Sequence, residues 1–189
     1  MKRQVILIRL WMLRLFTVLG IIVLTSGCTP THDWREVRSD EGGWVALFPG
    51  KPVEVARTIT LPDLTDPLRL TLQSARIGET MFAVGWTESA TESVRVALEA
   101  AMLNNLQAVT SSVQRKNIAP QSQAMVETSA EGLIKTDRVA PAVKATLWMR
   151  SLVRQGARPR VIEIVAVGPH HELSEEAARQ FIESLKFLD

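Results

Sequence analysis

The side chains most often used as nucleophiles, proton donors or metal ligands are few in this chain: one cysteine, Cys28, and three histidines, His32, His170 and His171. The run His170-His171-Glu172 could supply metal ligands, but adjacent residues rarely bind one metal without further ligands at suitable spacing. A Ser/His/Asp triad could assemble in space, yet the chain has no Gly-x-Ser-x-Gly motif and no glycine-rich phosphate loop. His32 lies in a polar segment, where a lone histidine is usually solvated. The sequence therefore predicts no catalytic, metal-binding or cofactor-binding residue.

Cys28 follows a segment typical of export signals. A basic start, an apolar run from Leu15 to Leu24 and the small residues Thr25-Ser26-Gly27 precede it. The segment resembles the lipobox of bacterial lipoproteins, which implies cleavage before Cys28 and acylation of that residue. A transmembrane anchor and a soluble export signal are the alternatives, although arginines interrupt the roughly 20 apolar residues that a spanning helix needs. In this family, an aspartate directly after the cysteine often signals retention in the inner membrane. The residue there is Thr29, which implies the outer membrane instead.

Cleavage at this point divides the chain. Residues 1–27 are predicted to be the signal peptide, residues 28–33 the lipidated N-terminus with a short tether, and residues 34–189 a single domain. The whole chain has 22 basic and 20 acidic residues, and removing the four basic residues of the signal leaves 18 basic and 20 acidic ones. The slightly negative mature protein lacks the basic footprint of a nucleic-acid-binding domain.

Hydrophobic periodicity predicts strands, a helix, more strands and a second helix. A capping box at Ser89 and Glu92 predicts the start of the first helix, and Ser174 is the expected N-cap of the second. The first strands are expected to form an antiparallel meander. The predicted strands are 44–48, 53–59, 68–75, 81–86, 112–118, 124–133, 143–153 and 160–167, the last being central in the sheet. This order predicts an α+β fold, an antiparallel sheet covered by helices.

Two stretches resemble a group of small exported bacterial proteins with the PsbP-like fold. They are Phe48-Pro49-Gly50-Lys51-Pro52 and the strand Val161 to Gly168, followed by a helix with Phe181-Ile182-Glu183-Ser184-Leu185. The resemblance implies an α/β/α sandwich and a protein-binding or accessory role. It implies no catalytic residue and no cofactor.

Two surface features are candidates for binding. Four arginines are predicted to gather at the end of one hairpin, where they could meet an acidic partner or form a solvated tip: Arg150, Arg154, Arg158 and Arg160. Trp148 is either an interface anchor or, as we expect, packed under a helix.

These observations favour a non-enzymatic envelope lipoprotein. We expect it to be bound to the bacterial cell membrane through Cys28, to face the periplasm, and to have an envelope protein as a possible partner. The alternative is a periplasmic hydrolase or metal-dependent enzyme that uses the loop around His170 and His171.

Overall fold

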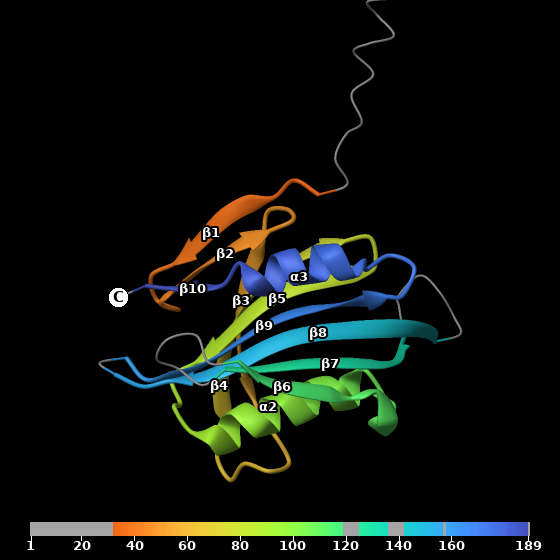
Figure 1. Ribbon diagram of the computed structural model, residues 1–189. Helices are drawn as coiled ribbons and strands as arrows, with labels where there is room; N and C mark the ends of the chain where they lie inside the picture. Colours follow the sequence, from red (N-terminus) through yellow and green to blue (C-terminus); the bar gives the residue numbers. More distant parts are fainter. Residues whose placement is uncertain (1–31, 119–124, 136–141, 157, 189) are drawn as a thin grey trace, which may run out of the picture. The chain divides into compact units, whose positions relative to one another are not determined.

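Figure 1 shows a computed structural model of the protein, which describes residues 32–118, 125–135, 142–156 and 158–188. The chain divides into two units, Met1–Thr31 and His32–Asp189, and the structure described below is that of the second unit. The predicted signal peptide and the predicted lipidation site, Cys28, lie outside the described residues.

Seven strands form one antiparallel sheet in the order β3-β4-β5-β9-β8-β7-β6. Strand β9 is at its centre, as predicted, and nearly all of its residues are buried because both of its faces are apolar. Its odd-numbered residues Val161 and Val165 pack towards one face, and Ile162 and Ile164 pack towards the other. The bounds are β3 Val53–Ile59, β4 Leu68–Ile77, β5 Thr80–Thr87, β6 Gln114–Ile118, β7 Met125–Ile134, β8 Val143–Arg154 and β9 Arg160–Pro169.

Three further strands form a small antiparallel sheet in the order β1-β2-β10, with bounds Arg35–Ser39, Trp44–Phe48 and Lys186–Phe187. The prediction of a strand over 44–48 is confirmed, but its place in a meander is wrong, because β2 pairs with β1 and β10 instead of β3. The side chains of Trp44, Ala46 and Phe48 are buried on the same face of β2 and join the largest core cluster.

Two α-helices pack on opposite faces of the large sheet (Figure 1). Helix α2, Glu92–Asn105, places Val94 and Leu98 against Val161 of β9. Its N-cap is Thr91, whose Oγ1 accepts the N–H of Val94 at 3.4 Å, so the predicted cap at Ser89 is wrong.

Helix α3, Glu175–Glu183, lies with the small sheet on the other face. The predicted cap at Ser174 is confirmed, since its side chain accepts the N–H of Ala177. Phe181 stacks edge-to-face on Phe48 of β2 and Phe82 of β5, with ring centroids 5.1 and 5.3 Å apart. This aromatic group joins helix α3 to both sheets.

The expected fold class, an α+β helix-covered sheet in an α/β/α sandwich, is wrong. The described residues are mostly β-sheet, with 51% in strands and 18% in helices. Helices of 14 and 9 residues are too short to cover both faces of seven strands, and a sheet shares the second layer with α3. A short 3₁₀ turn, η1 Thr110–Ser112, follows α2. None of the described helices is long and apolar enough to cross a bilayer.

Candidate functional site

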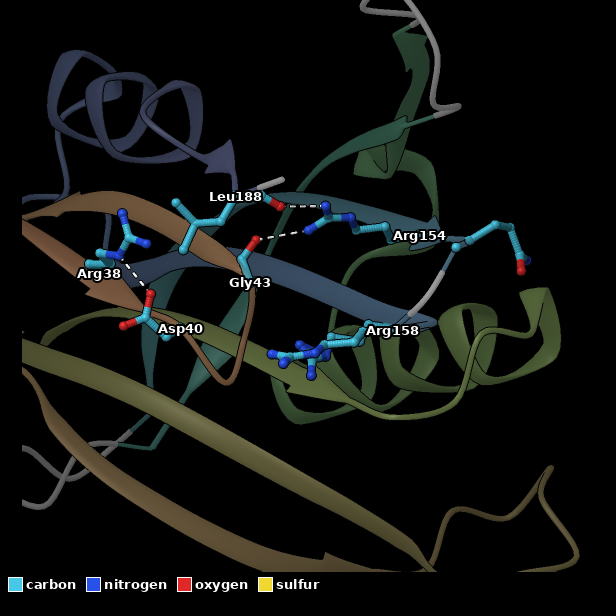
Figure 2. A pocket seen from close by; sticks show the side chains of 9 residues that line it. Arg38, Asp40, Gly43, Arg154, Arg158 and Leu188 are labelled. Atoms are coloured by element: carbon cyan, nitrogen blue, oxygen red, sulfur yellow. Dashed lines mark hydrogen bonds and ion pairs between the residues drawn. The ribbon is translucent and has the colours of Figure 1, made fainter.

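A basic pocket of about 460 Å³ lies where the β8–β9 turn meets the β1–β2 turn and the end of the chain (Figure 2). Three segments far apart in sequence build it: residues 38–43, residues 154–156 with 158–160, and Leu188. Its lining residues are Arg38, Asp40, Gly43, Arg154, Gln155, Gly156, Arg158, Arg160 and Leu188.

Arg154, the last residue of β8, is held in place by backbone acceptors. Its Nη1 donates to the carbonyl of Gly43 at 3.0 Å, and its Nη2 donates to the carbonyl of Leu188. The guanidinium also lies over the ring of Phe187, 5.7 Å from the centroid. These contacts tie the small sheet to the β8–β9 hairpin, and they fix one positive charge at the pocket wall.

Arg160, the first residue of β9, lies directly opposite Arg154 in the strand register. It is only 5% exposed, and its guanidinium stacks on the ring of Trp86 at 4.7 Å. Its Nε has no hydrogen-bond acceptor among the described residues. Burial lowers the pKa of Arg160, and the nearby charges of Arg158 and Arg154 lower it further. The charges of Glu88 and Glu41 act in the opposite sense. Like charges directly opposite each other destabilise a strand pair, so this register places a buried cation in an unfavourable position.

Gly43 keeps the space between these two arginines open. Its φ of +73° lies in the left-handed region, where glycine is favoured. A Cβ at this position would lie 3.1 Å from Nη1 of Arg154 and 3.5 Å from Nη1 of Arg160. Both guanidinium groups therefore approach the same space beside Gly43, and this space is free because Gly43 has no side chain.

The rim of the pocket is exposed. Arg38 donates from Nε to Asp40 at 2.7 Å, and this pair is open to solvent. Arg158 is exposed on the β8–β9 turn. In the part of the chain that the structure describes, no ion pair involves Arg154, Arg158 or Arg160. A second hollow, lined by Glu41 and Glu88, shares Arg158 and Arg160 with the pocket.

The predicted arginine cluster is confirmed for Arg154, Arg158 and Arg160 but not for Arg150. Arg150 lies opposite Glu127 of β7 and pairs with it at 2.7 Å, and it also reaches Glu183 of α3 at 3.3 Å. It is a structural arginine that joins α3 to the sheet.

Trp148 packs beside helix α3, as expected. It joins the edge of the largest core cluster, and the guanidinium of Arg179 lies 4.8 Å from its ring centroid. It is not an exposed anchor.

The sequence reasoning missed Arg38, Asp40 and Gly43. The signal that could have indicated them is Gly42-Gly43, a dipeptide typical of a tight turn between two strands. Even so, nothing local in the sequence shows that this turn meets the β8–β9 turn.

The histidines do not line the pocket. His170 is exposed, with Nδ1 2.9 Å from Oγ1 of Thr146, and His171 is 74% exposed and 3.7 Å from Glu172. His32 stacks on Trp34, with centroids 5.4 Å apart. Within the described ranges, no group of three His, Cys, Asp or Glu side chains could hold a metal ion.

No protein-family model matches the chain, and no curated protein matches it. The chemistry of the pocket is therefore read from its own residues. Guanidinium groups are always charged and donate several hydrogen bonds in a fixed plane, which suits them to bind anions.

Proposed function

We propose that the protein is a membrane-anchored envelope lipoprotein whose domain is a non-enzymatic binding or accessory module for an acidic partner. The observation that carries the binding role is the pair Arg154 and Arg160. These arginines face each other across β8 and β9 beside Arg158, with no ion-pair partner among the described residues. An anion in the pocket would offset this repulsion, and it would satisfy donors that are desolvated at Arg160.

The anchoring role rests on the sequence around Cys28. Acyl chains on one cysteine would attach the protein stably to a bilayer, because two or more chains hold where one binds only weakly. This proposal places the protein at the bacterial cell membrane, facing the periplasm, with the outer membrane favoured by Thr29.

The anchoring role is tested by growing cells with radiolabelled palmitate. We expect label on the wild-type protein and none on Cys28→Ser, which should accumulate as the longer precursor. A Cys28→Ser protein that is still processed to its normal length would overturn this role. A Thr29→Ala variant, which keeps the cysteine, is the matched control and should be labelled normally.

The binding role is tested by crosslinking in living cells. A photoreactive amino acid in place of Gln155, an exposed residue of the pocket lining that keeps all the arginines, should give a discrete adduct, whereas the same group at Arg57 on the exposed strand β3 should not. Replacing Arg160 by methionine in the same chain should reduce the adduct from position 155. Equal adducts from both positions would count against a role for the pocket.

A further inference from the structure

We infer that the ligand group of this pocket is a phosphate, held between Arg158 and Arg160. This inference rests on the proposed function, because it names the ligand of the same pocket.

The charge of the pocket fits a dianion better than a single carboxylate. Four arginines and one aspartate line it. Arg38 and Asp40 pair with each other at 2.7 Å, and Arg154, Arg158 and Arg160 form no ion pair in the described part of the chain. Glu41 and Glu88, in the adjoining hollow, favour the charge of Arg160 without pairing with it. A phosphate monoester carries about −1.5 to −2 charges near pH 7 and has three strong acceptor oxygens. A carboxylate carries one charge and has only two acceptor oxygens.

The directions of the donors lead to the same ligand. A planar carboxylate is best matched by one guanidinium that donates two parallel hydrogen bonds. Here the cations come from the end of β8, the turn and the start of β9, so the donors do not form one fork. Nη1 of Arg154 and Nη1 of Arg160 both approach Gly43. Arg154 uses two of its N–H groups on the carbonyls of Gly43 and Leu188, so we assign the main hydrogen bonds to Arg158 and Arg160. A tetrahedral phosphate accepts from several directions at once.

The pocket has a fixed, buried side formed by Arg160 and a side that is open to solvent at Gly156. Arg160 is nine-tenths buried on Trp86, so little side-chain entropy remains to be lost when a ligand binds. On the solvent side, a Cβ added to Gly156 would meet nothing within 4 Å. A volume of about 460 Å³ exceeds that of a phosphate alone, and it falls within the roughly 300–1,000 Å³ of small-molecule sites. The pocket therefore has room for the group that carries the phosphate.

This phosphate could belong to a small soluble molecule or to a lipid headgroup, and the chemistry of the contact is the same. The test uses the purified full-length protein in a non-ionic detergent. Isothermal titration calorimetry measures the binding of glycerol 3-phosphate. A second titration measures the binding of dihexanoyl phosphatidic acid, a short-chain lipid, with dihexanoyl phosphatidylcholine as its control. Glutarate, a dicarboxylate, is the competing anion in a parallel titration.

We expect saturable binding of glycerol 3-phosphate and weaker or no binding of glutarate. Arg158→Ala should weaken phosphate binding by about tenfold, the effect of losing one charge-assisted hydrogen bond. Arg57→Ala, which removes an exposed arginine from β3, should leave it unchanged. Arg158 is exposed and forms no ion pair with a described residue, so its loss should not unfold the domain.

The outcomes separate the two proposals. Binding of glutarate through Arg158 without binding of phosphate overturns the phosphate inference and leaves the acidic partner in place. Binding of neither anion counts against both. Phosphate binding that Arg158→Ala does not change also overturns the inference. If phosphate binds, dihexanoyl phosphatidic acid that binds more tightly than glycerol 3-phosphate, and does so through Arg158, assigns the ligand to a lipid headgroup. Equal or weaker binding of the short-chain lipid assigns the ligand to a soluble molecule.

Discussion

Replacing Glu163 by glutamine should stabilise the protein at neutral and alkaline pH. Glu163 lies in the central strand β9, opposite Gly85 and Ser151, and is 7% exposed. Its Oε1 has no hydrogen-bond partner among the described residues. Burial, and to a smaller extent the charge of Glu99, raises the pKa of Glu163 to about 8, while the charge of Arg95 acts in the opposite sense.

The neighbours of Glu163 explain why Arg95 does not neutralise it. Arg95 of α2 donates to Glu99 and to Ser151, each at 2.9 Å, and also pairs with Glu92. Burial alone would raise the pKa of Glu99, but hydrogen bonds from Arg115, at 2.5 Å, and from Arg95 lower it. Glu99 is therefore the charged partner of both arginines. The carboxyl group of Glu163 has no such partner, and its protonated, neutral form is favoured.

The magnitude follows from linkage between protonation and folding. An unfolded glutamate has a pKa of 4.5, so between 4.5 and about 8 the folded protein holds more protons at this site than the unfolded chain. Its stability must then fall as pH rises through this window, by up to about 1.4 kcal/mol per pH unit. The loss reaches about 3 kcal/mol at pH 7 and levels off near 5 kcal/mol above pH 8. Below pH 4.5 both states are protonated, and the effect is absent.

Urea unfolding of wild type and Glu163→Gln at pH 5, 6, 7 and 8 measures the effect. Every other ionisable group is present in both proteins, so the difference in their free energies of unfolding isolates Glu163. This difference should move in favour of glutamine as pH rises. Glu36→Gln, at an exposed position of β1, is the matched control and should show no such trend. A difference that stays constant from pH 5 to pH 8 would refute the reasoning.

Three further substitutions test the packing, each by chemical denaturation. Gly132→Ala should destabilise the protein by about 1–3 kcal/mol, because a Cβ there would lie 2.4 Å from the backbone oxygen of Leu106; a neutral effect would contradict this close approach. Thr91→Ala should lower the free energy of unfolding by about 1 kcal/mol, and Ser89→Ala should lower it much less, because Thr91 is the N-cap of α2. A larger loss for Ser89→Ala than for Thr91→Ala would show that Ser89 is the cap. Phe181→Ala should cost about 3–5 kcal/mol because its ring is fully buried between the two sheets; a loss below 1 kcal/mol would show that the layers separate without cost.

Strand positions were largely predictable because the pattern of apolar residues in a strand shows which of its faces are buried. In β8, Ala145, Leu147 and Met149 are buried and the residues between them are partly exposed, so alternation alone predicts the element. In β9 the uniformly apolar run predicts a central strand. Both signals are local, because the apolar pattern of a strand depends on which of its faces are buried.

Strand partners were not predictable in the same way. Strand β2 looks like the first strand of a meander, yet it pairs with β10, a strand of two residues near the end of the chain. A pair of residues is too short to give a periodic signal. When β1 and β10 are not recognised, α3 is the only element predicted on that face of the large sheet. The sequence therefore predicted a sheet covered by helices.

The arginine cluster shows how register separates residues that look equivalent in sequence. Arg150 and Arg154 lie on the same face of β8, four residues apart, which is about 13 Å along a strand. The cross-strand neighbour of Arg150 is Glu127, and the two form an ion pair at 2.7 Å. The neighbour of Arg154 is Arg160, another cation. Arg150 is thus neutralised within the fold, while Arg154 and Arg160 approach each other beside Gly43, which has no side chain to fill the space there. Because the fold satisfies Arg150 and leaves Arg158 and Arg160 unpaired among the described residues, the unpaired residues are the ones to mutate when a ligand is sought.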